Sequence, residues 1–254
     1  MLSSVEEINM FKILKNILIK SDAENKSLSD EYLEIVRKFG ELGIEIEDIN
    51  EVNVTVWKRI YLCIDNLYRN YPELPKGFFN RLNFKEENSI ACTAFCLKEN
   101  NLYDTTNVFV SLNKFYFLDT NNFKIKKAAT NIDIALEDYI EFSICHEFGH
   151  ILDIYFSLRY DSLGFRENVS ENEIIDFLNT IPLSNKLIEQ AIDIYNNRIG
   201  KSHKETLLSE KMGYTASKDN AEAFAESIAF NYFTKSNLLT NYIIEESRMS
   251  IEER

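Results

Sequence analysis

Apolar residues recur at helical spacing in the first part of the sequence. The segment Val5–Lys20 carries an apolar face interrupted by charged and amide side chains, which predicts an amphipathic helix and not a signal peptide. The same spacing predicts a second helix over Ser27–Phe39. Ser27 or Ser29 would cap this helix, and Gly40 would end it.

The period of the apolar residues then changes twice along the chain. It stays helical up to Pro72 and Pro75, and the apolar positions of this third helix are Val52, Val56, Trp57, Ile60, Ile64, Leu67 and Tyr68. Short apolar or alternating runs next predict a small antiparallel sheet, with strands over Ile90–Leu97, Val108–Leu112 and Phe115–Leu118. After Asp133 the pattern is helical again, so strands should directly precede a helix that begins near Ile134.

The composition agrees with a folded, mostly helical chain. A length of 254 residues with 45% apolar content can bury a core, and it fits one large domain or one domain with a helical extension. Only 7 Gly and 3 Pro occur, which argues against a turn-rich sandwich or barrel. We therefore expect a mostly helical α+β fold in which residues 1–50 form a helical N-terminal extension or cap.

The charge excludes one class of partner. Lys and Arg number 28 and Asp and Glu 41, a formal net charge of −13, so binding of nucleic acid through a basic surface is not expected. No run of about eighteen apolar residues occurs, so no membrane span is expected. The four Cys lack the spacing of a disulfide framework and are predicted to be reduced core thiols. A cytoplasmic protein is the simplest expectation, although a toxin delivered into a target cell by another route would look the same.

One segment of the predicted helix after Asp133 carries a chemical motif. His146-Glu147-Phe148-Gly149-His150 is an H-E-x-x-H pattern, which places two of the chain's 3 His one helical turn apart on one face. Two imidazoles so placed can bind one zinc ion, and Glu147 lies close enough to take a proton from an attacking water. The alternative is a buried helix with two satisfied core His. Gly149 favours the zinc site, because Gly inside a helix costs about 1 kcal/mol relative to Ala and usually has a packing reason.

A catalytic zinc site needs a third protein ligand and leaves a fourth position for water. The best source is a segment in which Asp219 and Glu222 form a capping-box-like helix start. Glu222 and Glu226 then lie one turn apart, flanked by Ala and Phe. Because unpaired carboxylates are costly to bury, we expect Glu222 to bind zinc and Glu226 to accept the free N–H of a ligating His. The alternative is that both carboxylates lie on a solvated edge.

Three other residues compete for the metal. His203 stands at a capping-box helix start in a polar stretch and is expected to be solvated. Asp153 lies near the ligand face, as a weaker rival or as a partner that supports a ligand. Cys145 is rotated by about 100° from His146 around the helix and is expected in the core.

The two motifs together resemble a known family. H-E-F-G-H at 146–150, followed by Tyr214 and by A-E-A-F-A-E at 221–226, is similar to the catalytic domain of anthrax toxin lethal factor and to related gluzincin endopeptidases, including the Pro-Pro endopeptidases. The resemblance covers Ile90 to Phe233. It implies a zincin-like metalloprotease domain over residues 51–254, with a small mixed sheet packed on the H-E-x-x-H helix.

The resemblance also implies a role for each residue of the motifs. His146, His150 and Glu222 would be the three ligands of one zinc ion. Glu147 would be the general base, and Tyr214 would help to stabilise the oxyanion. Glu226 matches the acidic residue one turn further on.

The chain departs from the family in two respects. Tyr214 lies one residue further from Glu222 than the family usually shows. The gap between the motifs is also longer than in lethal factor, which leaves room for helices over Asn172–Leu178 and Ser184–Ile199.

Proteases of this design commonly hold a substrate as an added strand on a sheet edge above the metal helix. The candidate edge is the run Cys92–Leu97, centred on Thr93, Ala94 and Phe95, and Val108–Val110 is its neighbour or rival. The net charge of −13 suits a basic peptide or protein substrate by electrostatic steering, unless the acidic surface serves only solubility. The sequence predicts no oligomeric state.

Two other functions stay open. Zinc-peptidase-like proteins that cleave repressors also carry H-E-x-x-H and a downstream Glu on an Ala-rich helix, although the separation of these motifs is usually shorter than that of His150 and Glu222 here. Such a regulatory zinc peptidase would act on a repressor or phage protein. The other alternative is a catalytically silent zinc-binding module, whose metal would be closed off by four protein ligands.

Overall fold

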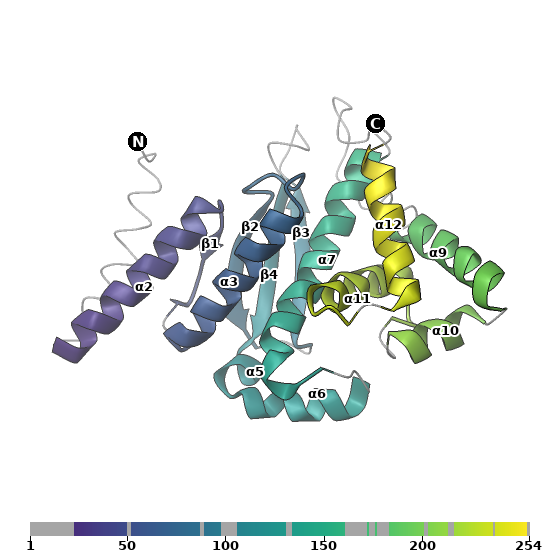
Figure 1. Cartoon of the computed structure of the whole chain (residues 1–254). Helices are drawn as coiled ribbons and strands as arrows, with labels where there is room; N and C mark the ends of the chain where they lie inside the picture. The colour runs from purple at the N-terminus through teal and green to yellow at the C-terminus, as the bar shows by residue number, and fades with distance from the viewer. Residues whose placement is uncertain are drawn as a thin grey trace.

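A small mixed sheet and a surrounding set of helices make up the protein in the computed structural model (Figure 1). The residues that it describes are 23–49, 52–86, 89–97, 106–130, 134–160, 172, 176, 183–200, 203–212, 216–235 and 237–252. Within them most residues are helical, which confirms the predicted α+β class with a small mixed sheet. No described helix has the length and apolar character needed to cross a membrane.

The sheet has the strand order β1-β2-β4-β3. Its strands are β1 (Glu45–Ile46), β2 (Phe79–Lys85), β3 (Ala91–Leu97) and β4 (Thr106–Asn113). The β1–β2 and β2–β4 pairs are parallel, and β3 pairs with β4 in antiparallel register, Thr93 opposite Val110. The predicted strands over Ile90–Leu97 and Val108–Leu112 are therefore confirmed as an antiparallel pair, and β3 is an edge strand of the described sheet.

Two predictions for the segment after β4 are wrong. Phe115–Leu118 is not a strand: helix α5 (Lys114–Leu118) forms there, because the Asn113 side chain accepts a hydrogen bond from the Phe115 N–H at 3.0 Å and caps it. The strands also do not directly precede the motif helix, which begins at Tyr139 and not near Ile134. Between them lie α5, η2 (Thr120–Asn122), α6 (Phe123–Thr130) and η3 (Leu136–Asp138).

The helices near the N-terminus agree with the predicted periods but not with the predicted ends. Helix α2 (Ala23–Glu41) starts before Ser27 and Ser29 and continues through Gly40, so neither Ser is its cap and Gly40 does not end it. Gly43 follows it with φ +76°, where an added Cβ would lie 2.7 Å from the Gly77 nitrogen. Helix α3 (Val54–Asn70), capped by Asn53, confirms the third predicted helix. The helix predicted over Val5–Lys20 lies outside the described residues.

Residues 23–49 share one hydrophobic core with the rest of the described chain. Trp57 of α3 is fully buried, with the Phe39 ring 5.7 Å and the Phe84 ring 4.9 Å away in edge contacts. Its indole N–H donates a hydrogen bond to the Ile49 carbonyl oxygen at 2.8 Å. The predicted division of the chain at residue 50 stays a prediction.

Helix α7 (Tyr139–Tyr160) is the central element of the fold. The sheet and α3 lie on one side of it and α11 (Asn220–Tyr232) lies on the other (Figure 1). The remaining helices are α9 (Leu183–Ile199), α10 (Lys204–Lys211) and α12 (Leu238–Glu252). Helix α9 confirms the one predicted over Ser184–Ile199, whereas the one predicted over Asn172–Leu178 falls almost wholly outside the described residues.

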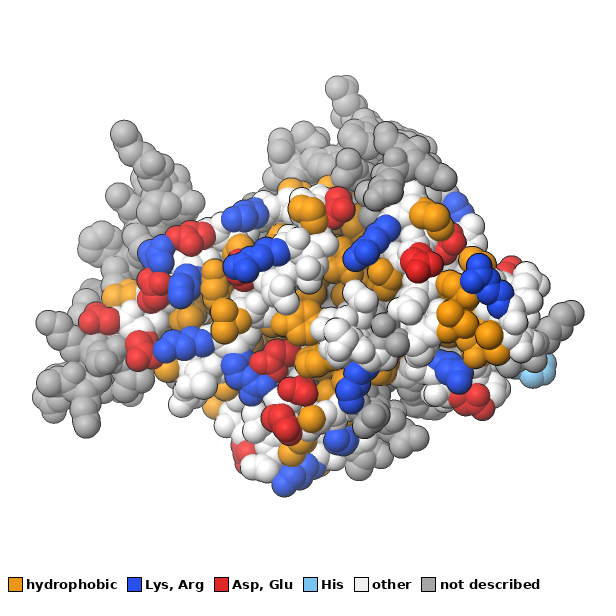
Figure 2. Space-filling view, in the orientation of Figure 1, with side chains coloured by type: hydrophobic (Ala, Val, Ile, Leu, Met, Phe, Trp, Pro, Cys, Tyr) orange, Lys and Arg blue, Asp and Glu red, His pale blue; other side chains and the backbone are white. Residues whose placement is uncertain are grey.

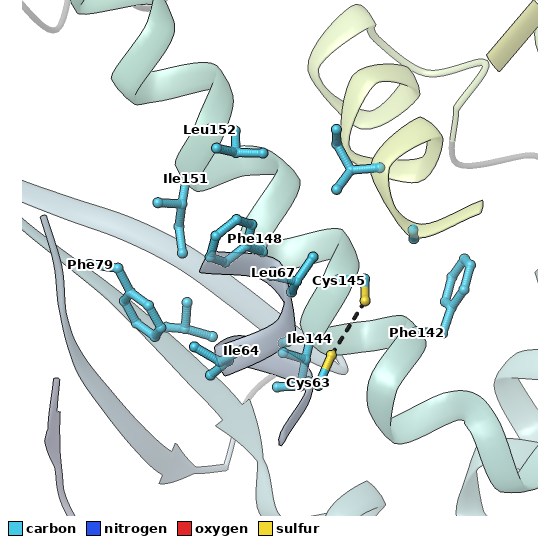
Figure 3. Packing of buried hydrophobic residues seen from close by; sticks show 14 of the residues in the cluster. Cys63, Ile64, Leu67, Phe79, Phe142, Ile144, Cys145, Phe148, Ile151 and Leu152 are labelled. Atoms are coloured by element: carbon cyan, nitrogen blue, oxygen red, sulfur yellow. Dashed lines mark hydrogen bonds between the residues drawn. The ribbon is translucent and has the colours of Figure 1, made fainter. Parts of the chain in front are cut away.

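The Cys residues only partly follow the prediction. Cys63 of α3 and Cys145 of α7 are buried free thiols whose sulfur atoms lie 3.4 Å apart, so they belong to the core as expected (Figure 3). Cys92 is exposed, because it lies on the face of β3 opposite to that of the buried Ala91. The prediction of a core thiol is therefore wrong for Cys92.

Candidate metal centre

The two imidazoles of the H-E-x-x-H motif lie side by side on α7. His146 and His150 are one turn apart, and their Nε2 atoms are 3.2 Å from each other. Apolar side chains of the same helix, among them Ile144, Phe148 and Ile151, pack into the core toward α3 and the sheet (Figure 3). This packing fixes the rotation of the helix about its axis, so that its two His face α11.

Helix α11 brings a carboxylate to the same place. The Asp219 side chain accepts a hydrogen bond from the Glu222 N–H at 2.8 Å, which caps the helix as predicted. The two Glu222 carboxylate oxygens lie 3.3 Å from His146 Nε2 and 3.6 Å from His150 Nε2. The predicted triad of His146, His150 and Glu222 therefore exists as a cluster of potential metal-ligand atoms.

The spacing of the nitrogen and oxygen atoms in this cluster fits a zinc ion. Zinc–nitrogen and zinc–oxygen distances near 2.1 Å in a tetrahedron place neighbouring ligand atoms about 3.3–3.5 Å apart. The two Nε2 atoms are 3.2 Å apart, and each lies near one of the two Glu222 oxygens, at 3.3 Å for Oε2 and 3.6 Å for Oε1, which is close to these edges. No fourth His, Cys, Asp or Glu of the described chain belongs to the cluster, so it offers the two imidazoles and one carboxylate of an open, catalytic type of site.

A close helix contact holds α7 and α11 at this spacing. A Cβ added to Gly149 would lie 2.5 Å from the Ala225 Cα and 3.1 Å from the Ala225 Cβ. Any larger residue at position 149 would therefore push the helices apart and move Glu222 away from both imidazoles. This is the packing reason that the sequence predicts for a Gly inside the motif.

The protonation of His150 and of Glu222 depends strongly on neighbouring charges. Burial lowers the pKa of His150, but the hydrogen bond with Glu222 and the negative charges of Glu147, Glu222 and Asp153 outweigh it and raise that pKa to about 9. Burial acts to raise the pKa of Glu222, but hydrogen bonds and charge interactions with both imidazoles hold it well below its ordinary value. Metal-free protein therefore carries a protonated His150 beside an ionised Glu222 at neutral pH.

Glu147 lies next to the cluster and is not part of it. Its side chain is buried, with 7% of the residue surface exposed, and one carboxylate oxygen accepts a hydrogen bond from the Thr93 hydroxyl of β3 at 2.6 Å. Glu147 is therefore not one of the potential ligand residues, as the sequence predicts. The contact between Thr93 and Glu147 could not be predicted from the sequence. The one signal is that Thr93 carries a hydroxyl in an otherwise apolar run.

The side chain of Asp153, on α7, reaches the start of α9 and is not among the potential ligand atoms. Its carboxylate accepts hydrogen bonds from the Ser184 N–H at 3.0 Å, the Ser184 hydroxyl at 2.6 Å and the Ser157 hydroxyl at 3.2 Å. Burial raises its pKa, although the bonds from Ser184 act in the opposite direction. Asp153 therefore caps a neighbouring helix and adds a negative charge that acts on His150.

The remaining candidates divide into three groups. Glu226 is buried, at 1% exposure, which contradicts a solvated edge; its predicted contact with a ligand imidazole stays a prediction. His203 is exposed at the start of α10, as expected, and Cys145 is in the core. Tyr214 lies outside the described residues, as do the side chains of Ala94 and Phe95, whose backbone forms part of β3.

Comparison with known proteins adds no family assignment. No protein-family model, no curated protein and no solved structure matches the chain. The resemblance to gluzincins therefore rests on the two sequence motifs, and the geometry described above rests on the chain's own residues.

Replacing Gly149 with Ala tests the helix contact. Because the new Cβ would meet Ala225, we expect the free energy of unfolding to fall by about 1–3 kcal/mol. The dissociation constant for zinc should rise by about 10- to 100-fold, since Glu222 moves away. Urea denaturation and competition with a chromophoric chelator measure the two quantities.

Gly40→Ala is the matched control. A Cβ at Gly40, in the last turn of α2, meets nothing within 4 Å. It should leave zinc affinity unchanged and alter the free energy of unfolding by less than about 1 kcal/mol. If both variants bind zinc equally and are equally stable, the proposed role of the Gly149 contact is wrong.

Zinc binding should release a proton. Because the pKa of His150 is about 9 without metal, the imidazole is protonated at pH 7 and must lose its proton to become a ligand. We expect about one proton released per zinc ion at pH 7, and an apparent affinity that rises up to about tenfold per pH unit and levels off above pH 9. Calorimetry in two buffers of different ionisation enthalpy counts the protons. Release of no proton, with an affinity that is constant between pH 7 and pH 9, would contradict this assignment.

Proposed function

We propose that the protein is a zinc-dependent endopeptidase of the gluzincin type, with a zincin-like fold, that hydrolyses peptide bonds of a protein substrate. The observation that carries the proposal is that potential ligand atoms of His146, His150 and Glu222 lie 3.2–3.6 Å apart, close to the spacing that zinc ligands have, with the Glu147 carboxylate nearby. The fit of one zinc ion with an open fourth position favours a catalytic site over a silent zinc-binding module.

The zinc site, Glu147 and Tyr214 have different proposed roles in the hydrolysis. Zinc held there would supply a Lewis acid that lowers the pKa of a coordinated water and polarises the peptide carbonyl. Glu147 takes the proton from the attacking water and returns it to the leaving amine nitrogen. Tyr214 is proposed to donate a hydrogen bond to the oxyanion, in which role one donor is typically worth about 3–4 kcal/mol.

Strand β3 is the proposed substrate edge. It pairs with β4 on one side and contacts α7, so its other edge can accept a peptide as an additional strand beside the metal centre. Val108–Val110 belongs to β4, which lies between β2 and β3, and is therefore the neighbour of this edge and not its rival. Thr93, Ala94 and Phe95 remain the proposed backbone contacts of the substrate.

The charge of the substrate stays a prediction. On the face shown in Figure 2, Lys and Arg side chains are interspersed with Asp and Glu, and no patch of one sign dominates. The net charge of −13 therefore supports a basic substrate only through the overall field of the protein.

Replacing Glu147 with Gln tests the proposal. The amide cannot take a proton from water, so cleavage should fall by about 100- to 10,000-fold while zinc stays bound. The measurement is cleavage-site mapping by mass spectrometry, with wild type and variant incubated in parallel with a peptide library made by digesting a bacterial proteome with trypsin. Zinc content is measured on the same samples.

Glu210→Gln is the control for this substitution, because Glu210 is exposed on α10. The Glu210→Gln variant should cleave the same peptides as the wild type and at the same rate. Cleavage by Glu147→Gln at the wild-type rate would contradict the role of Glu147, and a zinc-loaded wild type that cleaves no peptide would contradict the proposed function.

A further inference from the structure

A hydroxyl group of the edge strand holds the carboxylate of Glu147. Thr93 Oγ1 donates to Glu147 Oε2 at 2.6 Å and also lies 3.3 Å from the Glu147 carbonyl oxygen. The shorter distance falls in the range of a charge-assisted hydrogen bond between a hydroxyl and a carboxylate, about 2.5–2.7 Å. Among the described residues, Thr93 is the one donor to this carboxylate.

Within the described part of the chain, the other surroundings of Glu147 give its carboxylate no second hydrogen bond. Glu147 borders a cavity of about 10 Å³ whose other lining side chains are apolar and come from α3, the sheet and α7. They include Ile64, Phe79 and Ile144, which Figure 3 labels. This volume is at the lower limit of what one water molecule needs. The apolar wall therefore limits how far the carboxylate can move, and the Thr93 hydroxyl decides which way it points.

The position of a base matters for its efficiency. A general base has to lie within hydrogen-bond reach of the proton that it takes, and a misplacement of about 1 Å can cost about 100-fold in rate. With Oε2 bound to Thr93, Oε1 is the oxygen that remains for the attacking water. A second consequence follows from the position of Thr93 in β3: the strand proposed to receive the substrate also holds the base.

We propose that Thr93 is a positioning residue, which orients the Glu147 carboxylate for proton transfer through its side-chain hydroxyl. This inference rests on the proposed peptidase function. It differs from the proposed backbone role of β3 in substrate binding, because only the side chain of Thr93 is involved.

The experiment compares three substitutions of Thr93 on one peptide that the wild type cleaves, selected from the trypsin-digested library. Thr93→Val keeps the shape without the hydroxyl, and Thr93→Ala is a second hydroxyl-free variant in case the first does not fold. Both should lower kcat by about 10- to 100-fold and leave KM within about twofold. Thr93→Ser, which keeps the hydroxyl, should restore most of kcat. Thermal unfolding and zinc content should be equal in all of them.

Thr55→Val, at an exposed position in the first turn of α3, is the matched control and should leave kcat and KM unchanged. Wild-type kcat in the folded hydroxyl-free variants would overturn the role of Thr93 while leaving the peptidase function intact. An equal loss in Thr93→Ser would also overturn it, because the hydroxyl would then not be the cause. A zinc-loaded wild type that cleaves nothing in the library would instead overturn the peptidase function, and with it this inference.

Discussion

The distance between α7 and α11 controls the geometry of the candidate metal centre. Gly149 and Ala225 let the two helix backbones come so close that no side chain larger than hydrogen fits at position 149. At this distance the Glu222 carboxylate reaches two imidazoles on the opposite helix. The two halves of the site are therefore brought together by van der Waals contact between small residues, before any metal contributes.

The other side of α7 sets the position of Glu147. Apolar side chains of α7 fix its rotation against α3 and the sheet, and the Thr93 hydroxyl adds one directional contact to Glu147. Further along the helix, Asp153 joins α7 to the start of α9 through Ser184. His146, His150, Glu147 and Asp153 thus all depend on one element, α7, that is packed on both sides.

The parts of the site that were predicted from the sequence are those encoded locally. His146 and His150 are four residues apart in one helix, and Asp219 caps the helix of Glu222 three residues later, so both patterns are readable without knowledge of the fold. The missed features depend on residues distant in the chain or on irregular backbone. Strand β2 has a register shift between Phe79 and Arg81 that breaks its alternation, and the partner of Thr93 lies in another element.

The most direct test of the account is a crystal structure of zinc-loaded protein with anomalous diffraction measured at the zinc edge. We expect one zinc ion per chain, bound by Nε2 of His146, Nε2 of His150 and an oxygen of Glu222 at about 2.0–2.2 Å, with solvent in the fourth position. Zinc bound elsewhere, or a fourth protein side chain closing the site, would contradict the assignment of a catalytic metal centre.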